Sequence, residues 1–105
     1  MTDQLIDPAV AALVDAVNAG GKEAFFATLT DHATMSDDGT DRELGTWAER
    51  EIFSSSGRMD VENVSADGRT LTATYTNATW GSMRTRWTFT VTEDGRISRF
   101  ETGQA

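Results

Sequence analysis

The chain has 105 residues, enough for one domain with a single hydrophobic core, and 38% of them are hydrophobic and 25% charged, as in an ordinary soluble protein. A formal net charge of −8 at pH 7 repels the phosphates of nucleic acids, so nucleic acid is not an expected partner. The absence of cysteine excludes disulfides and thiolate chemistry, and the single histidine excludes a multi-histidine metal site within one chain.

Three helices are expected in the first half of the sequence. Asp7 and Pro8 form a helix start, because Asp can cap free amides and Pro fits the first helical position; apolar residues at helical spacing follow. A second, short helix is expected over residues 22–29. Thr46 and Glu49 have the spacing of a capping box, which predicts the start of a third helix.

After Gly57 the hydrophobic period changes from helical to two, and the sequence becomes rich in Thr, Val and aromatic residues, as half-buried strands are. Pairs of turn residues at 67–68, 81–82 and 94–95 divide this part into four strands. Four strands joined by tight turns predict an antiparallel meander. The expected fold class is therefore α+β, with three N-terminal helices packed on a strongly curved antiparallel sheet.

Aromatic residues recur on one phase of the predicted strands. Trp87, Phe89 and Phe100 share that phase with Met83 and Val91, so we expect their rings on the concave side of the sheet. The aromatic residues of the chain either fill the core or, in part, line a cavity for a flat apolar ligand; both interpretations stay open.

The stretch TDHATMSDDG, residues 30–39, gathers ionisable residues in an otherwise aliphatic and Thr-rich chain. Strand alternation places Asp37 in phase with Ala33 and Met35, facing the interior, whereas His32 is out of phase and should face away. Asp37 is either a carboxylate at a pocket mouth that can take up a proton, or part of a solvated Asp-Asp-Gly turn. The acidic residues that follow lack the spacing of a calcium loop, so no metal is expected.

Tyr75 and Asn77 are the candidates for a polar group facing Asp37. They share a strand face with Leu71 and Ala73, so a hydroxyl and an amide should point inward. Buried polar groups need partners, and a ligand is one of the partners open to them.

The opposite strand face carries charged residues among threonines. It is either a solvated face or the polar contact of a homodimer. We expect a homodimer through this outer face, formed by Arg84, Arg86, Arg99 and Glu101.

The order of these elements and the stretch NAGGKEAFFATLTDHATMSDDG resemble the NTF2-like superfamily, with its signature D-x-G-D-x-E-A-x-x-x-x-(F/Y)-A-D-D-A-x-x-x-D. That superfamily includes the SnoaL-like polyketide cyclases and the ketosteroid isomerases. The C-terminal WGSMRTRWTFTVTEDGRISRFETGQA resembles small actinobacterial members with no assigned activity. The resemblance covers essentially the whole chain and implies one cone-shaped domain over residues 1–105. It says little about activity, because this scaffold hosts isomerases, cyclases, dehydratases, epoxide hydrolases and binding proteins.

The resemblance implies that Asp37 stands where ketosteroid isomerases place their general base. The two side chains that donate hydrogen bonds to the oxyanion in those enzymes are not matched in this sequence: Leu13 stands in place of the Tyr, and Trp87 or a neighbour in place of the protonated Asp. Such donors are typically worth ~100-fold or more in rate each, so steroid isomerase activity is not expected.

The expected function is the binding of a small hydrophobic metabolite in the cone pocket, without a cofactor. The alternatives are a SnoaL-like or isomerase-like enzyme with Asp37 as general acid/base, and a non-catalytic dimerisation or interaction module. No apolar run is long enough to span a bilayer and no signal-peptide pattern opens the chain, so a cytoplasmic protein is expected, with no membrane partner. The candidate ligand-binding residues are Phe25, Trp47, Tyr75, Asn77, Trp87 and Phe100.

Overall fold

A computed structural model describes residues 6–105, which form three α-helices, a π turn and one six-stranded sheet. The helices are α1 (Pro8–Ala19), α2 (Lys22–Ala27) and α3 (Leu44–Ala48), and α3 runs directly into the π turn η1 (Glu49–Phe53). The strands are β1 (Leu29–Asp37), β2 (Thr40–Arg42), β3 (Arg58–Val64), β4 (Thr70–Asn77), β5 (Gly81–Val91) and β6 (Ile97–Gln104). None of the helices in this described part is long and apolar enough to cross a membrane.

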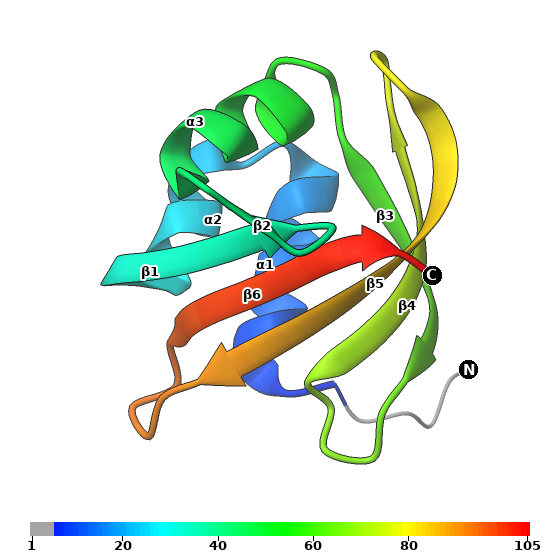
Figure 1. Cartoon of the computed structure of the whole chain (residues 1–105). Coiled ribbons are helices and arrows are strands. Elements are labelled where there is room, and N and C mark those ends of the chain that lie inside the picture. Colours follow the sequence, from blue (N-terminus) through cyan, green and yellow to red (C-terminus); the bar gives the residue numbers. More distant parts are fainter. Residues whose placement is uncertain (1–5) are drawn as a thin grey trace.

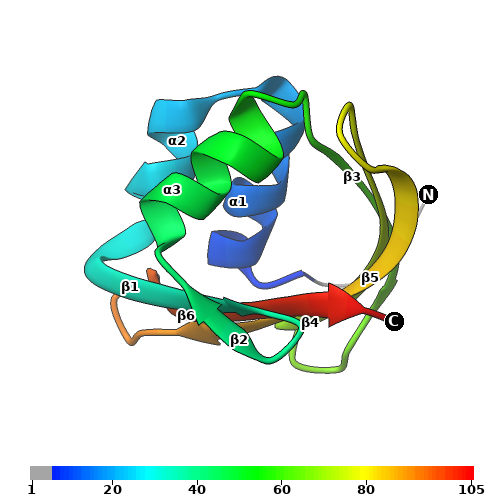
Figure 2. The same ribbon diagram turned by 45° about the horizontal axis from the view of Figure 1, so that its top comes forward.

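The three helices lie together on the concave side of a strongly curved, open sheet (Figure 1 and Figure 2). The strand order is β2-β1-β6-β5-β4-β3. The meander from β3 to β6 is antiparallel, as predicted. The prediction of a purely antiparallel sheet is wrong, because β1 pairs with β6 in parallel and β2 extends the sheet beyond β1. This pairing occupies the edge of β6 that a meander alone would leave open.

The predicted strand phase is confirmed by burial. Trp87 and Phe89 on β5 and Phe100 on β6 are buried against the helices, while Arg86 and Thr88, one residue out of phase, are exposed. The same alternation of buried and exposed positions runs through β4. The core therefore lies between the concave sheet face and the helices, with the charged residues outside.

Two predicted boundaries differ in the structure. The β4–β5 turn comprises residues 78–80 rather than 81–82, because the Asn77 side-chain oxygen accepts a hydrogen bond from the Trp80 amide at 2.8 Å and so closes the chain earlier. Gly81 already pairs with Asn77 across the two strands. The second helix ends at Ala27, and Leu29 is the first residue of β1.

The start of α3 corrects the predicted capping box. The helix begins two residues before Thr46, so Glu43 is the N-cap, and its carboxylate accepts hydrogen bonds from two first-turn amides at 2.8 and 3.1 Å. The Thr46 hydroxyl donates to the same carboxylate at 2.5 Å. Glu49 does not cap the helix and instead contacts Lys22 and Ser54. Glu43 thus fixes the helix that carries the pocket residue Trp47.

These contacts make the stability of α3 dependent on pH. The Thr46 side chain, followed by the two backbone amides, lowers the pKa of Glu43 below its usual value of 4.5. Because the folded pKa is the lower one, the cap stabilises the fold above the usual pKa, and this contribution is lost as the pH falls through the folded pKa. We expect Glu43→Gln to lower the free energy of unfolding at neutral pH and to leave it unchanged in acid, where the native side chain is protonated.

Urea denaturation at neutral and acid pH measures this difference. Glu93→Gln, which removes an exposed carboxylate from the β5–β6 turn, is the matched control and should change stability little at either pH. A loss in Glu43→Gln of equal size at both pH values would contradict the capping role.

Candidate functional site

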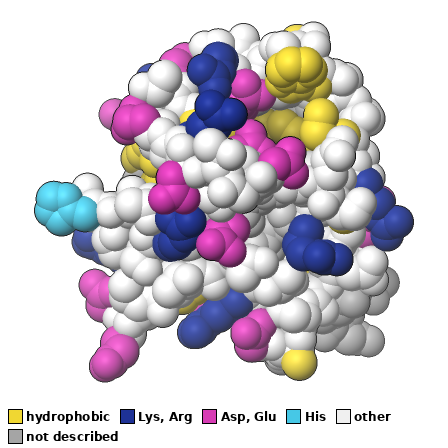
Figure 3. Space-filling view, viewed as in Figure 1, with side chains coloured by type: hydrophobic (Ala, Val, Ile, Leu, Met, Phe, Trp, Pro, Cys, Tyr) yellow, Lys and Arg dark blue, Asp and Glu magenta, His cyan; other side chains and the backbone are white. Residues whose placement is uncertain are grey.

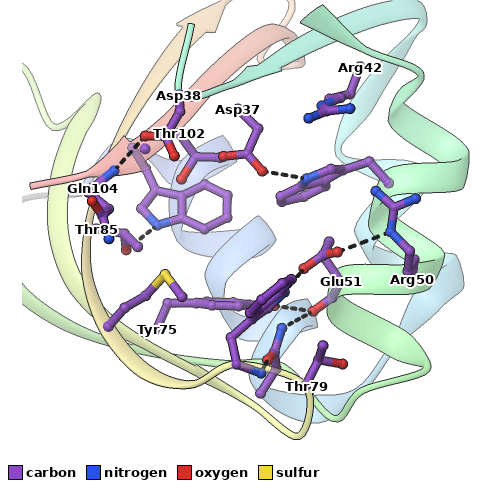
Figure 4. Close-up of a pocket in the computed structure, with 16 residues that line it drawn as sticks. Asp37, Asp38, Arg42, Arg50, Glu51, Tyr75, Thr79, Thr85, Thr102 and Gln104 are labelled. Atoms are coloured by element: carbon purple, nitrogen blue, oxygen red, sulfur yellow. Dashed lines mark hydrogen bonds and ion pairs between the residues drawn. The ribbon is translucent and has the colours of Figure 1, made fainter. Parts of the chain in front are cut away.

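A pocket of about 450 Å³ opens between α3, the π turn and the sheet (Figure 4). Its walls come from the ends of β1, β2 and β6, from β4, β5 and the turn between them, and from α3 and η1. Five of the predicted site residues line it: Asp37, Trp47, Tyr75, Asn77 and Trp87. Phe25 and Phe100, the other two, are fully buried in the core and are not part of this lining.

Asp37 is half-buried at the end of β1 and points into this pocket. Its Oδ2 atom accepts a hydrogen bond from Trp47 Nε1 at 3.1 Å. The turn begins one residue later, since Asp38 and Gly39 both have positive φ. Asp38 Oδ1 in turn accepts the Gln104 amide at 3.0 Å, which holds the turn against the end of β6. Asp37 is therefore the last strand residue, and the turn starts after it.

Tyr75 and Asn77 place their polar groups on the backbone of the π turn. The Tyr75 hydroxyl and the Asn77 amide donate to the carbonyl of Glu51, at 2.7 and 2.9 Å. Burial raises the pKa of Tyr75 well above its usual value, so its hydroxyl is a neutral donor at physiological pH. Both side chains line the pocket, and both are already engaged by the opposite wall.

The Glu51 carbonyl that takes these bonds belongs to the π turn. The amides of Ser54 and Gly57 donate five residues back, to Glu49 and Ile52, at 2.8 and 2.7 Å. A π turn shifts the backbone bonding by one residue, and such turns often occur at functional sites. Glu51 belongs to this π turn, and its side chain lines the pocket.

Glu51 is a third carboxylate of the pocket lining, beside Asp37 and Asp38, and the sequence did not point to it. One carboxylate oxygen pairs with Arg50 Nε at 3.0 Å, and the other accepts Trp80 Nε1 at 2.9 Å. Trp80 lies in the β4–β5 turn and is 63% exposed, so an indole stands at the pocket rim. Figure 3 shows hydrophobic side chains exposed on the upper right of this face, with acidic ones beside them. A tryptophan in the short turn between two strands was the feature of the sequence that could have pointed to this rim.

The other residues singled out from the sequence lie away from the pocket. His32 is exposed on β1 and stands out from the surface, as its phase predicted (Figure 3). Leu13 is fully buried on α1. Within residues 6–105, no group of three or more His, Asp or Glu side chains is placed to hold a metal ion.

Two arginines of the outer sheet face form ion pairs within the chain. Arg84 contacts Glu62 at 3.0 Å, and Arg99 contacts Asp41 and Glu101 at 3.0 and 3.3 Å. Arg86 is exposed beside them. The homodimer through this face stays a prediction.

No protein-family model matches the sequence, and no curated protein matches it. Solved structures do match. An NTF2-like protein of unknown function from Cytophaga hutchinsonii has a TM-score of 0.72 at 13% identity, over 96% of this chain and 92% of that one. A Mycobacterium tuberculosis protein in complex with estradiol-17beta-hemisuccinate has a TM-score of 0.71 at 15% identity, over 90% and 88%. The epoxide hydrolase/cyclase-like enzyme SalBIII, described in pyran ring formation, has a TM-score of 0.69 at 17% identity, over 92% and 88%. At these identities the likeness concerns architecture alone, and it shows that the chain has the NTF2-like fold.

Proposed function

We propose that the protein binds a small, largely apolar molecule in the pocket described above. The observation that carries this proposal is the pocket itself: its volume of about 450 Å³ lies in the range of small-molecule sites, and all three tryptophans of the chain line it together with Tyr75. The steroid hemisuccinate held by the Mycobacterium tuberculosis protein supports the choice of a small apolar ligand for this fold. The cytoplasm stays the expected location.

A catalytic role for Asp37 is the second candidate. Its carboxylate is half-buried in the pocket and has one oxygen on Trp47, which is an arrangement suited to a general acid/base. The neighbouring Tyr75 and Trp87 donors are engaged by the protein itself, so a developing oxyanion would find few ready donors among them. Binding is therefore the better supported function.

Calorimetric titration with phenylbutanol, an uncharged apolar probe, tests binding. We expect saturable binding that Met83→Trp weakens by about tenfold or more, because the larger side chain fills the pocket from β5. Thr88→Trp places the same side chain on the exposed outer face of the same strand and should leave binding unchanged. Equal affinity in both variants would show that the probe binds elsewhere, and no saturable binding of any apolar probe would contradict the proposed function.

A further inference from the structure

We infer that the ligand carries a protonated amine as its polar end, held by Asp37 and faced by the aromatic rings of the pocket. The inference rests on the proposed function and adds the chemical class of the head group. It follows from which hydrogen-bonding groups in the pocket are already engaged and which are open.

The aromatic donors that line the pocket all have partners in the protein. They are Trp47 Nε1 to Asp37 Oδ2 at 3.1 Å, Trp80 Nε1 to Glu51 Oε1 at 2.9 Å, Trp87 Nε1 to Thr85 Oγ1 at 2.8 Å, and Tyr75 Oη to the Glu51 carbonyl at 2.7 Å. A ligand acceptor that contacts one of these aromatic donors, such as the oxygen of a ketone, would have to take it from its present partner, and the other donors of the lining, such as Arg42 and Gln104, lie outside this aromatic group. That exchange leaves a protein acceptor without its partner, which lowers the net gain from the new hydrogen bond, most strongly at the buried Trp87.

Open acceptors remain on Asp37 and on the neighbouring Asp38, and of the two only Asp37 is half-buried, since Asp38 is exposed and already accepts the Gln104 amide. Trp47 donates to Oδ2 of Asp37, and among the described residues none donates a hydrogen bond to its Oδ1. No lysine or arginine of residues 6–105 forms an ion pair with this carboxylate, although its side chain is half-buried. Glu51 differs, because both of its oxygens have partners. A ligand that donates hydrogen bonds and carries positive charge fits the open position on Asp37.

The walls around Asp37 also suit a cation. Indole and phenol faces attract an ammonium group, tryptophan most strongly. Trp80 exposes most of its indole at this pocket, which the largely buried Trp47, Trp87 and Tyr75 also line. The formal net charge of −8 adds a long-range attraction for cations. Of the two pocket arginines, Arg50 is paired with Glu51 at 3.0 Å and Arg42 is exposed. Neither arginine forms an ion pair with Asp37.

Four probes with a common apolar body and different head groups test this inference. They are phenylbutylamine, phenylbutanol, phenylbutyrate and benzylacetone, titrated by calorimetry at neutral pH. We expect the amine to bind about tenfold or more tightly than the alcohol, because both can donate a hydrogen bond to Asp37 but only the ammonium brings a positive charge to the carboxylate. The ketone and the carboxylate should bind no more tightly than the alcohol.

Asp37→Asn identifies the group responsible. The asparagine oxygen can still accept from Trp47, so the pocket should keep its shape while the amine loses its advantage over the alcohol. Asp31→Asn removes the same charge from an exposed position on the same strand and should leave the preference intact. Arg42→Gln should leave amine binding unchanged or slightly tighter.

The outcomes separate the head group from the pocket. If the alcohol binds as tightly as the amine, or if the amine preference survives in Asp37→Asn, the inference is overturned while the proposed function stands. Tightest binding of phenylbutyrate, lost in Arg42→Gln, would likewise overturn it and assign the pocket to anions. If none of the probes binds, the proposed function fails, and the inference fails with it.

Discussion

Replacing Trp87 with alanine is expected to lower the free energy of unfolding by about 3–5 kcal/mol, as large aromatic deletions in cores do. Trp87 is 1% exposed, and its indole is the centre of the aromatic cluster between the sheet and the helices. Its ring centroid lies 5.7 to 6.3 Å from those of Phe100, Tyr75, Trp47 and Phe89. Because small domains have only about 5–15 kcal/mol of stability, the variant should be close to unfolding.

Urea denaturation followed by circular dichroism measures this loss, and Trp80→Ala is its control. Trp80 is the same residue type but is 63% exposed in the β4–β5 turn, so its removal should cost roughly 0.5 kcal/mol or less. Trp87→Phe keeps a ring in the core and should fall between the two. Equal losses in Trp80→Ala and Trp87→Ala would mean that burial does not determine the effect.

The position of Trp87 was predictable because a strand has a simple period. Alternation along β5 fixes which side chains face the helices, and one buried residue in the correct phase determines all the others. The Asp-Pro start of α1 was also predictable, and it is confirmed because the Asp7 carboxylate accepts a hydrogen bond from the Ala9 amide at 2.9 Å. Both features are determined by residues only a few positions apart in the sequence, and patterns of that length can be recognised in the sequence.

The parallel pairing of β1 with β6 was not predictable in the same way. It joins residues more than sixty positions apart, as in the pair Met35 and Phe100, and no local turn specifies it. Asp37 was placed correctly at a strand end, but its neighbour in the pocket, Trp47, comes from α3. Contacts of this kind depend on the packing of whole elements.

The π turn is the clearest limit of pattern analysis. A period of 3.6 residues describes an α-helix, and the extra residue in η1 rotates the following side chains away from the positions that this period assigns. Glu51 therefore lies in the pocket although its charged surroundings in sequence favour a solvated helix face. Gly57, just after this turn, is the sequence feature that goes with it, because the absence of a side chain there leaves room for Tyr75.

Gly57→Ala should accordingly be among the most damaging single-methyl additions to this chain. A Cβ atom there would lie 2.1 Å from the Tyr75 hydroxyl oxygen and 3.0 Å from the backbone Cα of Ile52. The glycine backbone is held by its hydrogen bond to the Ile52 carbonyl, so Tyr75 must move and give up its bond to Glu51. Overpacking and the lost hydrogen bond together predict a loss of about 2–4 kcal/mol.

A double-mutant cycle with Tyr75→Phe tests this mechanism, because the phenylalanine removes the oxygen that the new methyl group would meet. We expect Tyr75→Phe alone to cost about 0.5–1.5 kcal/mol, and the penalty for Gly57→Ala to be at least ~1 kcal/mol smaller in that background. Gly21→Ala is the matched control, since the nearest atom to its Cβ is 3.6 Å away and no strain is expected. Additive penalties in the cycle would show that the alanine acts through Ile52 rather than Tyr75, and that the Tyr75 hydroxyl does not depend on Gly57 for its place on the π turn.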